Sequence, residues 1–119
     1  MRLKRLLLVQ GLFYLFTGLW PLIHIRSFME VTGYKTDVWL VKMVALLTLS
    51  IALVLLNQRR EKSASPLLGI CSALSFLIID VTYSLNGTIS RIYLVDAVAE
   101  ALFVCIGLSV LIFKTRKPN

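Results

Sequence analysis

Four long apolar stretches divide this sequence, and they constrain its fold more than any other feature. They run at about Leu6 to Ile25, Val38 to Leu56, Pro66 to Leu85 and Ile92 to Phe113. Each has roughly 20 residues, the length at which a helix crosses the ~30 Å hydrocarbon core of a bilayer. Only 16% of the 119 residues are charged, against about 25% in ordinary soluble domains. We therefore predict a small integral membrane protein, and a soluble enzyme is disfavoured.

The same stretches predict an all-α fold class, a transmembrane four-helix bundle that forms a single domain over residues 1–119. Strands of a membrane barrel are short and alternate in polarity, whereas these stretches are continuously apolar. Residues typical of helix starts and turns separate them, namely Thr36, Asp37, Ser65, Pro66, Asn86 and Gly87. The first stretch is too long for a signal peptide and no small-residue cleavage site follows it, so we expect it to be retained.

The distribution of cations predicts the orientation. Nine cations fall in the N-terminal tail, the second loop and the C-terminal tail, namely Arg2, Lys4, Arg5, Arg59, Arg60, Lys62, Lys114, Arg116 and Lys117. The other side of the membrane receives Arg26, Lys35, Lys42 and Arg91. Because loops rich in Lys and Arg stay in the cytoplasm, both termini should be cytoplasmic. The net charge of +7 is therefore an orientation signal, and no nucleic-acid partner is expected.

Ionisable residues within the predicted spans are the unusual feature. A carboxylate at the centre of a span costs about 2.5 to 3.5 kcal/mol, so it is expected to face the bundle interior, water or an opposite charge. Asp96 and Glu100 are four residues apart and share one helix face. Asp80 belongs to a small or polar stripe with Gly69, Ala73 and Ser84. We expect these acids to face other helices.

We expect polar residues of the first two spans to contact the acids of the third and fourth spans. Gln10, Tyr14, Thr17, Pro21 and His24 follow the 4-3-4-3 spacing of a helix-packing seam. At 1.5 Å per residue, Lys42, Asp80 and Asp96 lie roughly 6 to 9 Å below the outer boundary. His24 then lies near that boundary and Glu100 near the midplane. The candidate binding residues are His24, Arg26, Lys42, Asp80, Tyr83, Tyr93, Asp96 and Glu100.

Purely structural interpretations of these polar residues are also possible. In one alternative, the charges form a cluster that only holds the helices together, since polar residues bind membrane helices to one another. Lys42 can extend its amine to the headgroups, and Tyr83 and Tyr93 lie where interfacial aromatic residues usually anchor a protein. Cys71 and Cys105 are widely separated, and one His with two distant Cys predicts no metal site and no cofactor.

Three functions follow from these alternatives. The first is an outward polar pocket that binds a small polar or amphipathic ligand with proton sensitivity. The second is a structural or accessory membrane subunit whose charges only join helices. The third, and least supported, is a quinone-linked membrane redox protein. Catalytic residues are not predicted, and the expected partners are the lipid bilayer, a small ligand, and a second copy or another membrane protein.

Several segments carry a family resemblance. They are GLWPLIH at 18–24, RSF at 26–28, VTG at 31–33, KTD at 35–37, WLVK at 39–42, IS at 89–90 and YLVDAVAE at 93–100. Through them the chain resembles a family of small uncharacterised bacterial four-span integral membrane proteins. The resemblance implies four spans and the bacterial inner membrane, and no activity. In size and span number the chain is more weakly similar to DoxX-like four-helix membrane proteins.

Overall fold

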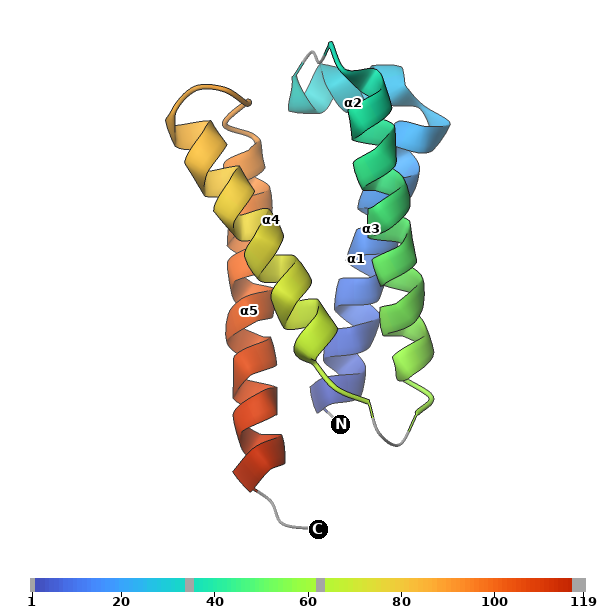
Figure 1. Ribbon diagram of the computed structural model, residues 1–119, viewed down its shortest axis with the longest axis vertical. Helices are drawn as coiled ribbons and strands as arrows, with labels where there is room; N and C mark the ends of the chain where they lie inside the picture. Colours follow the sequence, from blue (N-terminus) through green and yellow to red (C-terminus); the bar gives the residue numbers. More distant parts are fainter. Residues whose placement is uncertain (1, 34–35, 62–63, 117–119) are drawn as a thin grey trace.

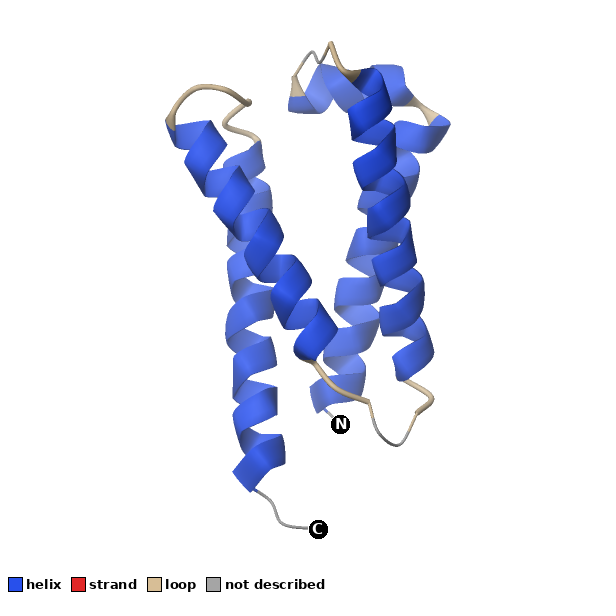
Figure 2. Ribbon diagram, in the orientation of Figure 1, coloured by secondary structure: helices blue, strands red, loops and turns tan. Residues whose placement is uncertain are grey.

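The computed structural model describes residues 2–33, 36–61 and 64–116, and within them the chain is helical and has no strand (Figures 1 and 2). The helices are α1 (Arg2–Ile23), α2 (Ile25–Thr32), α3 (Val38–Gln58), α4 (Leu67–Leu85) and α5 (Tyr93–Arg116). All but α2 contain a segment long and apolar enough to cross a membrane, namely Leu3–Ile23, Val38–Gln58, Leu67–Leu85 and Tyr93–Phe113. The predicted all-α four-helix bundle is confirmed, and the chain is a multi-pass membrane protein.

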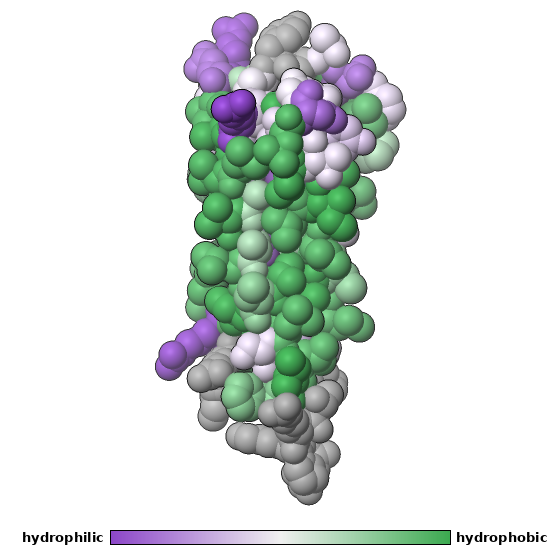
Figure 3. All heavy atoms as spheres, turned by 90° about the vertical axis from the view of Figure 1, so that its left-hand side faces the viewer, coloured by the Kyte–Doolittle hydropathy of each residue, from purple (hydrophilic) through white to green (hydrophobic). Residues whose placement is uncertain are grey.

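The surface of the bundle has the polarity that a bilayer requires. Hydrophobic side chains cover the middle of the face in Figure 3, and hydrophilic ones gather at one end. Large apolar side chains point outward from every long helix, among them Phe16, Leu53, Ile78 and Leu102, each more than half exposed. In water such a surface would be unstable, whereas in hydrocarbon it is the expected one.

Both chain ends lie at the same end of the bundle, together with the α3–α4 connection (Figure 1). The opposite end carries α2 and the α4–α5 loop, and we call it the α2 end. The predicted turn at Asn86-Gly87 is present in that loop, where Gly87 has a positive φ of 84° and Asn86 Oδ1 accepts a hydrogen bond from the Thr88 backbone. Three cations used for the orientation, Lys35, Lys62 and Lys117, lie outside the described residues.

The four long helices pack as two pairs, α1 with α3 and α4 with α5, with few contacts between the pairs. Glycines make the close approach in the first pair. A Cβ atom built at Gly18 would lie 3.0 Å from the Ala45 carbonyl oxygen, and one at Gly11 would lie 2.8 Å from Leu56 side-chain atoms. Small residues are common where membrane helices approach closely, and here they join α1 to α3.

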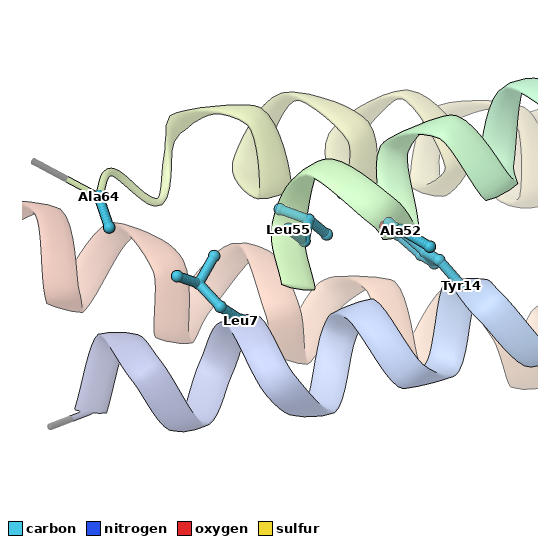
Figure 4. Close-up of a cluster of buried hydrophobic side chains, with 5 residues drawn as sticks. All are labelled: Leu7, Tyr14, Ala52, Leu55 and Ala64. Carbon is cyan, nitrogen blue, oxygen red and sulfur yellow. The ribbon is translucent and has the colours of Figure 1, made fainter. Parts of the chain in front are cut away.

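Tyr14 of α1 takes part in the contact between the two pairs. One buried cluster consists of Leu7, Tyr14, Ala52, Leu55 and Ala64 (Figure 4). A second cluster consists of Leu6, Ala73, Phe103 and Val110. The Tyr14 ring packs edge-on against Phe76 of α4 and Phe103 of α5, with ring centroids 5.4 and 6.2 Å away. Side chains of both helix pairs therefore bury Tyr14.

The first span ends earlier than predicted, and α2 was not predicted at all. The helix stops at Ile23 instead of Ile25, because His24 leaves the helical conformation and becomes the N-cap of α2. His24 Nδ1 accepts a hydrogen bond from the Ser27 backbone, and Trp20 Nε1 donates one to Ser27 Oγ. These bonds turn the chain, and α2 crosses the end of the first helix pair (Figure 1).

Candidate functional site

The polar stripe of α4 faces the bundle interior as predicted. Gly69, Ala73, Asp80 and Ser84 are all buried, and Asp80 is only 4% exposed. The large apolar residues Ile78 and Ile79 are more than half exposed and supply the outward face of the same turn. Since apolar side chains prefer lipid, their position rotates α4 so that the Asp80 carboxylate points inward.

Two acids of α5 meet Asp80. Glu100 is 1% exposed, and Asp96, four residues earlier, is half-buried. Asp80, Asp96 and Glu100 each offer one carboxylate oxygen to a group whose members lie within 4.8 Å of one another. We call these three residues the acidic triad. Helix α4 holds one member and α5 the other two, so the tight packing of this pair creates the site.

Helix α1 adds two polar side chains, Tyr14 and Gln10, to the site. The Tyr14 hydroxyl donates a hydrogen bond of 2.7 Å to Glu100 Oε1. Gln10 Nε2 donates to the Gly69 carbonyl oxygen at 2.9 Å and to the Tyr14 hydroxyl at 3.2 Å. Gln10 and Tyr14 are both buried. One polar network therefore connects α1, α4 and α5.

The described part of the chain provides no cation that pairs with the acidic triad. Among the described residues, no lysine, arginine or histidine forms an ion pair with Asp80, Asp96 or Glu100. Carboxylate oxygens of the three acids lie within 4.8 Å of one another, and ionised carboxylates this close repel one another. Asp80 Oδ2 is buried and has no hydrogen-bond donor. Such an arrangement is chemically able to hold a proton or another cation.

The remaining candidate residues are more exposed than Asp80 and Glu100. His24, Arg26 and Lys42 are exposed, His24 serves as a helix cap, and Tyr83 is 40% exposed on α4. Tyr93 is half-buried at the first residue of α5. Lys42 is exposed on α3, a helix that packs mainly on α1, and helix geometry tilts its side chain toward the N-terminus of α3 at the α2 end.

The triad member Asp96 lies close to the α2 end of the bundle. Asp96, the most exposed member, lies in the first turn of α5, next to the α4–α5 loop. Ser84 Oγ donates a hydrogen bond to the Ser90 carbonyl oxygen and ties this loop to α4. A Cβ atom built at Gly33, which follows α2, would lie 3.4 Å from Ser90 Cβ. The end of α2 and the α4–α5 loop therefore meet at this end of the bundle.

Gln10 and Tyr14 were predicted to lie in a packing seam and not in the site. The single His and the two distant Cys predicted no metal site, whereas the structure groups three carboxylates. The seam spacing was the available signal, and Gln10, Tyr14 and Pro21 are indeed buried. Cys71 and Cys105 are free and exposed on the helix surfaces.

Comparisons with known proteins do not assign the site. No family model, no curated protein and no solved structure matches the chain. The function is therefore argued from the acidic triad and its surroundings.

Proposed function

We propose that this protein, with both termini in the cytoplasm of a bacterium and its helices in the inner membrane, binds a small positively charged ligand at the acidic triad in competition with protons. The observation that carries the proposal is the convergence of three carboxylates with no ion-paired cation among the described residues. The orientation follows from the cations at the end that holds both termini. The triad then lies in the outer half of the bundle.

Energetics support a binding role. Each carboxylate within a span costs about 2.5 to 3.5 kcal/mol when it is placed at the centre, and ionisable residues there generally mark ion or substrate routes. Amide or hydroxyl side chains join helices without this cost. A bound cation neutralises the carboxylates, and protons compete because they occupy the same oxygens.

A second function has specific support. The hydrogen bonds Tyr14–Glu100 and Gln10–Gly69 connect α1 to α5 and α4, and such bonds strengthen helix packing in membranes. In this alternative the protein is a structural subunit, and Glu100 serves as a hydrogen-bond acceptor in a protonated cluster. It does not explain why three acids gather where one acceptor is sufficient.

Thermal unfolding of the purified full-length protein in lipid nanodiscs distinguishes the two functions. The probes are Na⁺, methylammonium and Ca²⁺, each tested at several pH values. The triad variants are Asp80→Asn, Asp96→Asn and Glu100→Gln, and the matched controls are the exposed acids Glu30→Gln and Asp37→Asn. We expect at least one probe to raise the Tm of wild type and both controls, with a smaller effect at low pH, and the triad variants to lose this response.

The opposite pattern would support the structural subunit. If the triad variants change stability alone and respond to every probe as wild type does, the triad is not the binding site. A stoichiometric membrane partner that co-purifies with wild type, with no response to any probe, would also contradict the proposal.

A further inference from the structure

We infer that the acidic triad is a binding site for a single hard divalent metal cation of the Ca²⁺ and Mn²⁺ class, held by carboxylate oxygens. The inference rests on the proposed function, because it names the ligand class of the same site. Four observations carry it: the spacing of the oxygens, the kind of donor atoms, the charge of the site and a buried acceptor without a donor.

The spacing of the oxygens fits one ion. The three carboxylates present oxygens that lie within 4.8 Å of one another. Calcium–oxygen distances are about 2.3 to 2.6 Å, so two oxygens on opposite sides of such an ion are at most about 5 Å apart. One ion therefore contacts Asp80, Asp96 and Glu100 without any rearrangement of α4 against α5.

The donor atoms select the class of metal. Carboxylate oxygens suit Ca²⁺, Mg²⁺ and Mn²⁺, whereas Zn²⁺ and Cu²⁺ sites usually include imidazole or thiolate. His24 caps α2, and Cys71 and Cys105 are exposed on the helix surfaces. In the described part of the chain, the triad is the one group of three or more such residues with metal-binding geometry. Mg²⁺ is less suited to a site this buried, because it retains several water ligands.

The charge of the site favours a divalent ion. Three ionised carboxylates carry three negative charges, and no lysine, arginine or histidine in the described residues forms an ion pair with them. A divalent ion neutralises two of these charges, whereas a monovalent ion leaves two uncompensated in an apolar environment. The remaining charge is partly offset by the hydrogen bond that Glu100 accepts from Tyr14.

A buried oxygen without a donor points independently to a ligand. Asp80 is 4% exposed, and its Oδ2 atom receives no hydrogen bond. Buried acceptors nearly always have a partner, because an unsatisfied one is costly. Asp80 belongs to the group whose carboxylate oxygens lie within 4.8 Å of one another, so a metal ion bound to the triad can supply the missing partner.

Tyr14 acts as a positioning residue for this metal site. Its hydroxyl binds one oxygen of Glu100 and is itself held by Gln10, so the orientation of the Glu100 carboxylate is set before the ion arrives. Hydrogen bonds of this kind to metal ligands typically change metal affinity about 10- to 100-fold.

The test is direct metal binding to the full-length protein in nanodiscs of uncharged phosphatidylcholine, after treatment with a chelator. Electron paramagnetic resonance reports bound Mn²⁺, and calorimetry reports Ca²⁺. We expect about one Mn²⁺ per chain, displaced by Ca²⁺ and not by an equal concentration of Na⁺. Asp80→Asn and Glu100→Gln should lose this binding, whereas Glu30→Gln and Asp37→Asn should keep it.

Two further variants separate metal binding from folding. Glu100→Asp keeps a carboxylate, and it should weaken Mn²⁺ binding while the helix content stays that of wild type. Tyr14→Phe should weaken binding about 10- to 100-fold and change the Mn²⁺ resonance spectrum, which a purely structural role would not do. Full binding in Tyr14→Phe would contradict the positioning role.

The result that overturns the inference is specific. If folded wild type binds neither Mn²⁺ nor Ca²⁺ at millimolar concentration, while methylammonium or Na⁺ still raises its Tm through the triad, the divalent class is wrong and the proposed function stands. If no cation acts through the triad, both proposals are wrong. Metal binding that persists in folded Asp80→Asn and Glu100→Gln would place the ion elsewhere and overturn the inference.

Discussion

Tyr14 and Glu100 are 86 residues apart in the chain, and the Tyr14 hydroxyl donates a hydrogen bond of 2.7 Å to Glu100 Oε1. Tyr14 belongs to the α1–α3 pair and Glu100 to the α4–α5 pair. Few other contacts join the two pairs. This bond therefore links the acidic triad to the packing of the whole bundle.

Removing that hydroxyl should loosen the bundle. We expect Tyr14→Phe to lower the free energy of unfolding by about 1 to 2 kcal/mol, because a buried hydrogen bond between helices is lost. The ring contacts with Phe76 and Phe103 are retained in this variant. Unfolding in increasing detergent denaturant measures the change. The matched control is Tyr83→Phe, because the Tyr83 side chain is 40% exposed and its hydroxyl has no hydrogen bond with a described residue. An equal effect of both changes would contradict this account.

The stability of the metal-free protein should depend on pH. Carboxylates that contact one another repel when they are ionised, and this repulsion is stronger in a poorly solvated site. The Tm of wild type in the presence of a chelator should therefore fall as the pH rises and recover when the pH is lowered again. Asp80→Asn removes one of the charges, so it should flatten this curve and raise the Tm at high pH. A parallel curve for Asp80→Asn would show that the triad does not cause the pH dependence, and Asp37→Asn serves as the exposed control.

Adding a Cβ atom at Gly69 should destabilise the protein while Gln10 is present. A Cβ atom at Gly69 would lie 2.5 Å from Gln10 Oε1, so Gly69→Ala should displace the Gln10 side chain and break its bond to the Gly69 carbonyl oxygen. We expect a loss of about 1 kcal/mol in the free energy of unfolding. In a Gln10→Ala background the same change should be neutral or stabilising, since Ala favours helix more than Gly does. Equal effects in both backgrounds would contradict the contact.

The orientation can be tested with single cysteines in a protein that carries Cys71→Ser and Cys105→Ser. Thr88 is exposed in the α4–α5 loop at the α2 end, and Arg60 is exposed just after α3 at the other end. A membrane-impermeant maleimide should label Thr88→Cys in intact cells, and Arg60→Cys only after the membrane is broken. The reverse pattern would place both termini outside and the triad in the inner half of the membrane.

Much of the architecture was predictable because membrane insertion is decided locally. The free energy of a span is a sum over about 20 consecutive residues, so α3 and α4 begin within one residue of the predicted positions. The stripe of Gly69, Ala73, Asp80 and Ser84 was predictable for the same reason, since the 3.6-residue period places them on one face. The break at His24 was missed because it depends on side-chain bonds among Trp20, His24 and Ser27.

The sequence by itself determined that four apolar helices cross the membrane, that both chain ends lie together, and that the buried acids occupy inward faces of the third and fourth spans. Only the tertiary structure decided which faces meet: α4 and α5 bring Asp80, Asp96 and Glu100 together, α1 adds Tyr14, and Lys42 remains outside. The physical reason is that a helix period sets the direction of a side chain on its own helix, whereas the neighbour it meets depends on how the helices pair and rotate. In this bundle the glycine contacts of α1 with α3 and the tight packing of α4 with α5 determine that pairing.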